Sequence, residues 1–215
     1  MSGERGIFLT FEGVDGSGKT TQAHRLAHVL EAAGMEVILL REPGGTPIGE
    51  RIRAILLDPR SDEMADECEL LLMNASRAQL VRQVIQPSLE RGAIVVSDRF
   101  FDSTFAYQYG GRGVDRDVTL SCNLLGSCGL VPDLTFLLDL DPQLALRRAT
   151  KGGVDRLEAE GAQFQERVRD AYLELAGMEP GRVMVVDADA SEDEVSLRVA
   201  SLVRHTFPQL DFHPL

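Results

Sequence analysis

The chain has 215 residues, 44% of them hydrophobic and 26% charged, which suits one large domain or two small ones with a substantial core. Its formal net charge of -12 argues against general nucleic-acid binding, which needs a basic face. No apolar run approaches the ~20 residues that cross a bilayer, so no membrane partner is expected. Three cysteines without metal-ligand spacing and an N-terminus unlike a signal peptide predict a cytoplasmic protein.

The most specific pattern lies between a predicted apolar strand at residues 7–12 and a predicted helix at 20–33. It has the form G-x-x-x-x-G-K-[ST], which in this context is typical of a phosphate-binding loop. Backbone N–H groups of such a loop, and the positive end of the following helix, favour phosphate oxygens. Lys19 would reach the β- and γ-phosphates, and the Thr20 hydroxyl would ligate magnesium. The predicted phosphate-binding residues are Gly13, Val14, Asp15, Gly16, Ser17, Gly18, Lys19 and Thr20.

Short apolar strands then alternate with helical patterns along the chain. This alternation predicts a single α/β domain over 1–215, with a five-stranded parallel sheet and helices on both faces. Ligands of such sheets bind beyond the carboxyl ends of the strands, so loops 13–20, 42–46 and 98–108 should meet there. The further strands are expected at 37–40, 93–97, 134–139 and 183–186, the helices at 48–57, 66–89, 115–125, 142–149, 164–176 and 191–206, and a loop-rich stretch at 98–113.

An Asp–Arg pair ends the third predicted strand. Asp98 can hold magnesium through water or accept a proton, and Arg99 can donate two parallel hydrogen bonds to a phosphate. A structural ion pair at a strand end would have the same sequence, but the phosphate loop favours the functional interpretation. A GTPase switch would need Asn-Lys-x-Asp for guanine, which is absent. The pattern therefore favours a phosphoryl-transfer enzyme over a nucleotide-dependent switch.

Six segments of the sequence have the pattern of one known family: 11–21, 41–46, 76–81, 98–108, 132–135 and 155–158. Over nearly its whole length the chain resembles the bacterial thymidylate kinases of the P-loop nucleoside monophosphate kinase superfamily. The Glu-Pro-Gly-Gly-Thr loop and the Asp-Arg…Ser-Thr…Ala-Tyr-Gln stretch are much more specific than the phosphate loop. The resemblance implies phosphorylation of dTMP to dTDP by ATP and Mg²⁺ in dTTP biosynthesis, by a homodimer.

The resemblance also implies roles around the acceptor nucleotide. Arg99 would hold the dTMP phosphate, and Asp15 would lie near the sugar hydroxyl and that phosphate. Thr104 and Gln108 would face the thymine edge and the deoxyribose. Tyr107 occupies a position implicated in rejecting a 2′-hydroxyl. These five residues come from two of the loops expected at the sheet edge.

Further substrate-binding residues are expected on two helices and the second loop. Arg77 matches an arginine that donates to a thymine carbonyl, and Glu42 and Arg53 border the same pocket. For Arg53 a surface-helix position is an equally good interpretation. Met73 stands where the family commonly has a phenylalanine stacked on thymine; its sulfur can lie against a flat ring for ~0.3–1.5 kcal/mol. A methionine on the apolar, core-facing side of the helix would give the same sequence pattern.

Basic residues gather around a glycine pair at 152–153. The resemblance implies a mobile lid at about 147–158 that closes over the phosphates. Arg156 and Arg148 are the preferred lid arginines, and Arg147 and Lys151 are left open; a solvated helix end is the alternative. The predicted catalytic residues are Lys19, Arg99, Arg156, Asp15 and Arg148, and the predicted metal ligands are Thr20 and Asp98. Another nucleoside monophosphate or deoxynucleoside kinase is the nearest rival function, ahead of a non-catalytic switch.

Overall fold

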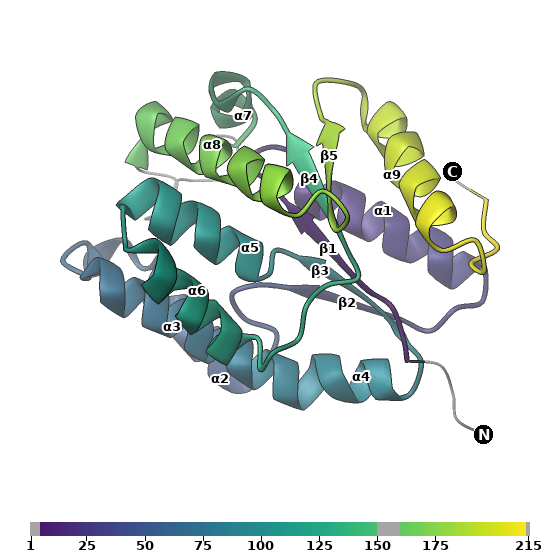
Figure 1. Cartoon of the computed structure of the whole chain (residues 1–215), viewed down its shortest axis with the longest axis horizontal. Coiled ribbons are helices and arrows are strands. Elements are labelled where there is room, and N and C mark those ends of the chain that lie inside the picture. Colours follow the sequence, from purple (N-terminus) through teal and green to yellow (C-terminus); the bar gives the residue numbers. More distant parts are fainter. Residues whose placement is uncertain (1–4, 150–159, 214–215) are drawn as a thin grey trace.

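The computed structural model describes residues 5–149 and 160–213 and contains the predicted five-stranded parallel sheet (Figure 1). The strand order is β2-β3-β1-β4-β5, so the first strand lies at the centre of the sheet. β1 is completely buried, as a parallel strand covered on both faces should be. The strands are β1 (Phe8–Glu12), β2 (Val37–Arg41), β3 (Ile94–Asp98), β4 (Leu134–Asp139) and β5 (Val183–Asp187).

Helices cover both faces of the sheet, which confirms the predicted α/β architecture (Figure 1). Right-handed crossovers place α1 and α9 together on one face and the remaining helices on the other. The helical elements are α1 (Lys19–Ala32), α2 (Pro47–Leu57), η1 (Pro59–Ser61), α3 (Asp66–Leu80), η2 (Val81–Ile85), α4 (Gln86–Glu90), α5 (Phe101–Thr104), η3 (Phe105–Arg112), α6 (Arg116–Gly126), α7 (Pro142–Ala149), α8 (Ala162–Met178) and α9 (Glu192–Thr206).

The register of the strands aligns their carboxyl ends at one edge. Phe11 and Arg41 are both paired with Asp98, and Asp139 is paired with Asp187. The residues that follow β1, β2 and β3 therefore leave the sheet side by side. This register places the loops 13–20 and 42–46 and the segment after Asp98 around one site, as the sequence predicts.

The prediction of a loop-rich stretch at 98–113 is wrong, because most of it is helical. α5 continues directly into the π-helical segment η3. Gly110 and Gly111, within this stretch, lie where α8 crosses η3. A Cβ on Gly110 would lie 2.4 Å from Ala171 Cβ, and one on Gly111 would lie 2.5 Å from the Phe164 ring. These glycines permit close helix packing rather than a turn.

The helix predicted at 66–89 and the start of α9 each have a further local feature in the structure. The long helical pattern at 66–89 is continuous, but a π-helical turn, η2, interrupts it just before Pro87. At the start of α9, Ser191 and Glu194 form a capping box. No helix within residues 5–149 and 160–213 is long and apolar enough to cross a membrane.

Candidate functional site

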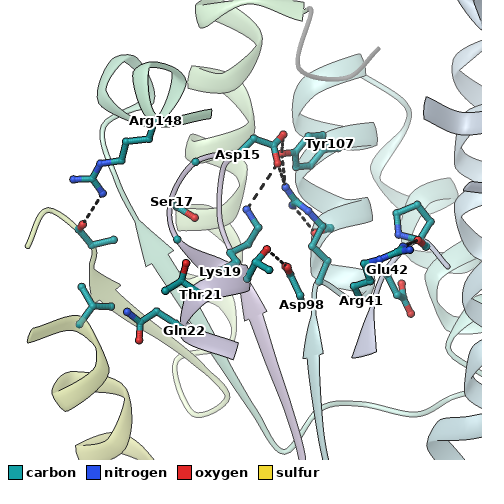
Figure 2. A pocket seen from close by; sticks show the side chains of 18 of the residues that line it. Asp15, Ser17, Lys19, Thr21, Gln22, Arg41, Glu42, Asp98, Tyr107 and Arg148 are labelled. Atoms are coloured by element: carbon teal, nitrogen blue, oxygen red, sulfur yellow. Dashed lines mark hydrogen bonds and ion pairs between the residues drawn. The ribbon is translucent and has the colours of Figure 1, made fainter. Parts of the chain in front are cut away.

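A cavity of about 820 Å³ lies at the carboxyl edge of the sheet. Figure 2 shows Lys19 and Asp98 in its middle, with Arg148 to one side and Glu42 to the other. The sequence predicts most of its walls, but not the wall formed by the segment after β5. This unpredicted wall consists of Ala188, Ala190, Ser191, Glu192 and Val195.

The phosphate loop has the backbone that its glycines allow. Gly13, Gly16 and Gly18 have φ values of 138°, 83° and 97°, which other residues rarely adopt. A Cβ on Gly13 would also lie 2.5 Å from the Leu138 carbonyl oxygen. Ser17 Oγ is buried and has no hydrogen-bond partner among the described residues. A buried hydroxyl without a partner fits a loop built to surround a polar ligand such as a phosphate.

Lys19 lies in the middle of this loop and is almost fully buried. Its Nζ donates 2.8 Å to the Val14 carbonyl and lies 3.8 Å from Asp15 Oδ1. Burial, followed by the nearby charge of Arg99, lowers the pKa of Lys19 to about 8. Burial alone would raise the pKa of Asp15, but the charges of Arg99 and Lys19 lower it below its usual value. The loop thus contains an ionised carboxylate beside a lysine whose charge depends on a nearby anion.

Arg99 joins the phosphate loop to the helix that follows β3. Its backbone is left-handed, with φ of 72°, and its NH2 donates to Asp15 and, at 3.0 Å, to the Tyr107 hydroxyl. The Tyr107 hydroxyl in turn donates 2.8 Å to Asp15 Oδ2. Arg99 NH1 donates 3.0 Å to Ser103 Oγ and 3.3 Å to the Gly13 carbonyl oxygen. The structure therefore brings together the predicted residues Asp15, Arg99 and Tyr107.

Behind Arg99 lies a buried carboxylate that the sequence interpretation missed. Glu12 Oε1 accepts from Phe100 N at 2.7 Å and from Ser103 N at 3.2 Å, so it caps the start of α5. Its Oε2 accepts 2.8 Å from the hydroxyl of Tyr172 on α8. Burial, and then the charge of Asp102, raise the pKa of Glu12 to about 7. The only sequence signal was a charged residue at the end of an otherwise buried strand.

The acceptor side contains a buried ion pair. Arg77 Nε donates 2.8 Å to Glu42 Oε2, and both side chains are at most 3% exposed. Arg77 NH1 donates 2.9 Å to Thr104 Oγ1, and its NH2 donates 3.1 Å to the Phe100 carbonyl. Burial raises the pKa of Glu42 to about 7 against the opposing effect of Arg77. Glu42, Arg77 and Thr104 thus form one connected wall of the cavity.

The remaining predicted substrate residues also line the cavity. Met73 lies one helical turn before Arg77 on α3, and Gln108 lies one turn after Thr104. Arg53 reaches the same wall from α2, where its NH1 donates 3.0 Å to the Pro43 carbonyl. Arg53 is half-buried on α2 and lines the cavity, a position that fits the border of the acceptor pocket.

Thr20 and Asp98, the predicted metal ligands, are in direct contact. The Thr20 hydroxyl donates to Asp98 Oδ2 across the loop (Figure 2). Both supply oxygen atoms, which magnesium prefers. In the described residues no group of three or more His, Cys, Asp or Glu could hold a metal ion. Two protein oxygens fit magnesium, which usually keeps several waters and binds nucleotide phosphates as well.

The predicted lid is only partly described. Arg148, near the end of α7, lines the cavity, and its NH1 donates 3.4 Å to the Ala188 carbonyl (Figure 2). Arg147 is exposed. Arg156, Lys151 and the glycine pair lie outside the described residues, and with them most of the range 147–158.

A five-stranded parallel sheet with a phosphate loop, facing a pocket lined by several arginines, defines a P-loop kinase of the nucleoside monophosphate class. The family model described as thymidylate kinase matches residues 11–199. The chain belongs to the thymidylate kinase family.

Individual relatives agree with this assignment over most of their length. The thymidylate kinase of Deinococcus radiodurans is 48% identical over 200 residues, covering 93% of this chain and 97% of the relative. That of Chlorobaculum tepidum is 46% identical over 207 residues, covering 92% and 96%. The crystal structure of thymidylate kinase from Ehrlichia chaffeensis matches with a TM-score of 0.76 at 36% identity, covering 93% of this chain and 99% of that one.

Proposed function

We propose that this chain transfers the γ-phosphoryl group of ATP, with Mg²⁺, to the phosphate of dTMP. Membership of the thymidylate kinase family makes it an enzyme that phosphorylates dTMP in nucleotide biosynthesis. The observation that carries the proposed mechanism is the contact of Arg99 with Asp15 in the phosphate loop. Through it, the loop that would hold the donor and the arginine that would hold the acceptor share one network.

Catalysis by this arrangement is mainly positioning and charge neutralisation. An oxygen of the dTMP phosphate forms a bond to the γ-phosphorus as the bond to the β-phosphate oxygen breaks, which gives dTDP and ADP. Lys19 and the loop N–H groups hold the donor phosphates, and Arg99 holds the acceptor. No general base is needed, because the acceptor phosphate is already an anion. Magnesium, held by Thr20 and Asp98, would neutralise charge on the donor phosphates.

The base of the acceptor would lie against the wall formed by Glu42, Arg77 and Thr104. Arg77 would donate to a thymine carbonyl, Met73 would lie against the ring, and Gln108 would face the base edge. Tyr107, which is held by Asp15 and Arg99, would lie next to the 2′ position of the sugar. Arg148 and Arg156 would complete the site from the lid.

A coupled ADP-release assay across dTMP, dUMP, dCMP, dGMP, AMP and thymidine tests this function. dTMP should give the highest kcat/KM. Turnover of thymidine without turnover of dTMP would overturn the proposal in favour of a deoxynucleoside kinase. Nucleotide binding without any acceptor-dependent turnover would support the switch instead.

We also propose that the enzyme is a cytoplasmic homodimer. Large apolar side chains remain exposed on α3 and α6, which pack against each other, and exposed apolar area favours association. These exposed side chains are Leu71 on α3 and Val118, Leu120, Leu124 and Leu125 on α6. The mass of one chain is 23.6 kDa, and analytical ultracentrifugation of the purified protein should give twice this mass. A single species with the mass of one chain would contradict the dimer.

A further inference from the structure

A buried carboxylate with no role in the proposed mechanism lies behind the acceptor side of the cavity. Glu69, on α3, is 1% exposed, and its Oε1 accepts a hydrogen bond of 2.9 Å from Gln108 Nε2 on η3. Gln108 is also 1% exposed and lines the cavity, whereas Glu69 is not among the described residues that do. The contact with Gln108 therefore offers a route by which Glu69 can influence a ligand.

Arg112 holds Glu69 in place from the opposite side. Its Nε and NH2 donate 3.2 Å to Glu69 Oε1 and Oε2, which is a two-point contact. The same guanidinium pairs with Glu160 and lies 5.1 Å from the centre of the Phe164 ring. Contacts from three parts of the chain thus restrict Arg112, and through it the Glu69 carboxylate.

The contacts of Glu69 with Arg112 determine which end of the Gln108 amide faces it. Glu69 Oε1 and Oε2 both accept from Arg112, which can only donate, and Oε1 also accepts from Gln108 Nε2, so in this arrangement the carboxylate acts as an acceptor only. The amide must therefore turn its NH2 group to Glu69, which leaves the carbonyl oxygen Oε1 for the opposite direction. Within the described part of the chain, no hydrogen bond involves Gln108 Oε1. The orientation follows from the chemistry of the pair rather than from the placement of the amide atoms alone.

We propose that Glu69 is a positioning residue that presents the carbonyl oxygen of Gln108 to the acceptor base and so selects bases that offer a ring N–H. This inference rests on the proposed function, because it deepens the choice of acceptor. Thymine and uracil carry a hydrogen on N3, whereas the N3 of cytosine is an acceptor and would face Gln108 Oε1 without a proton between them. Such an unpaired, buried contact is what rejects a substrate most strongly.

Arg77, the second proposed partner of the acceptor base, favours the same bases as Gln108. Arg77 NH2 gives one of its two hydrogens to the Phe100 carbonyl, and the other is left to donate. A donor suits the O4 carbonyl of thymine and opposes the N4 amino group of cytosine. One protein donor and one protein acceptor, on two residues that line the same cavity, match the adjacent carbonyl and N–H of a thymine edge.

The test uses Glu69→Gln, which keeps the shape of the side chain but lets it donate as well as accept. The Gln108 amide can then adopt either orientation. We expect the ratio of kcat/KM for dTMP to that for dCMP to fall by about tenfold or more, through KM, with kcat for dTMP and KM for ATP within about twofold. Glu67→Gln, an exposed neighbour on the same helix, is the matched control and should leave the ratio unchanged.

A second variant separates positioning from a general structural effect. In a Gln108→Leu background, Glu69→Gln should cause no further loss of discrimination; an equal loss there would overturn the inference. An unchanged ratio in folded Glu69→Gln would also overturn it. If Glu69→Gln does not fold, Gln108→Leu alone still decides, because an unchanged ratio in that variant contradicts the proposal.

Binding measured by calorimetry keeps this test separate from that of the proposed function. If the wild-type protein binds dTMP but does not turn it over, the proposed function fails, and the dTMP and dCMP affinities of the same variants still test Glu69. If turnover of dTMP is normal and only the discrimination fails to respond, the inference about Glu69 fails alone.

Discussion

The two halves of the cavity are built in different ways. The donor half consists of consecutive residues, 13–20, whose backbone turns around one lysine. The acceptor half is assembled from side chains on α2, α3, α5 and η3 and in the loop after β2, joined by buried contacts such as Glu42–Arg77. A contiguous loop uses groups that every residue has, so its specificity is low. An assembled wall uses groups that must be positioned by the fold, and it can therefore distinguish one nucleotide from another.

The difference also appears in the charges before any ligand binds. On the acceptor side, Arg77 is already paired with Glu42 and Arg99 with Asp15. On the donor side, Asp15 Oδ1 lies 3.8 Å from Lys19 Nζ, and burial lowers the pKa of Lys19. The acceptor side is positioned in advance, whereas the donor side depends on the phosphate for its full charge.

The largest expected effect is on the donor side. Lys19→Ala removes the only cation within the phosphate loop, so kcat should fall by about 10³-fold or more, with the affinity for dTMP nearly unchanged. Steady-state kinetics and dTMP calorimetry measure the two quantities. Arg25→Ala, on the same helix α1 but ion-paired with Asp193 at the surface, is the control. A kcat near that of the wild type would contradict the role of Lys19.

Arg99→Lys tests the connection between the halves. A lysine keeps the charge but cannot contact Asp15, Tyr107 and Ser103 at once, because it lacks the planar fork. kcat/KM for dTMP should fall by about 10²-fold. Arg91→Lys, at an exposed position before β3, should behave as the wild type. Equal activity of Arg99→Lys and wild type would mean that charge alone, without the fork geometry, is sufficient.

Glu12 lies where the donor and acceptor halves join. Its titration should make the free energy of unfolding depend on pH. Its pKa is raised from 4.5 to about 7 in the folded protein, so between these values the folded state binds more protons than the unfolded state. The free energy of unfolding should therefore fall as pH rises from about 4.5 to 7, by on the order of 1–3 kcal/mol from this group. Urea unfolding of Glu12→Gln should show a flatter pH profile than the wild type. Identical profiles would contradict the assignment.

Donor and acceptor binding should respond differently to alkaline pH. Above pH of about 8 Lys19 loses its proton in the free protein, and a bound phosphate must restore it. ATP affinity should then fall by up to about tenfold per pH unit, while dTMP affinity, which depends on arginines, stays level. Calorimetry between pH 7 and 9 in buffers of different ionisation enthalpy would detect the proton uptake. An equal fall in the affinities for ATP and dTMP would contradict the proposed difference between the donor and acceptor halves.

The smallest effect is expected from Met73→Ala. A methionine against a flat ring contributes ~0.3–1.5 kcal/mol, so KM for dTMP should rise by a few fold with kcat unchanged. Met64→Ala, on the segment before α3 and outside the residues that line the cavity, is the control. An unchanged KM in folded Met73→Ala would make Met73 a packing residue only.

The sequence predicts the fold and the donor half well because both depend on local patterns. Strand runs, helix periodicity and the loop at 13–20 each lie within one continuous segment. Glu12, Tyr172 and Glu69 were missed because their importance lies in contacts between distant segments. Glu12 and Tyr172, for example, are 160 positions apart and share a hydrogen bond of 2.8 Å. Gly110 and Gly111 lie in the stretch wrongly predicted to be loop-rich, where a glycine for helix packing looks the same in a sequence as a glycine for a turn.

The π-helical segment η3 limits where residues can be inserted into or deleted from this chain. Thr104, Gln108 and Arg112 follow one another along α5 and η3, and the wider winding of η3 determines which of them reach the cavity and Glu69. Deleting one residue from 105–112 would tighten the segment towards an α-helix and rotate everything after it by about 100°. Gln108 and Arg112 would then leave their partners together. Insertions and deletions should therefore be tolerated in surface turns of this chain but not within these eight residues.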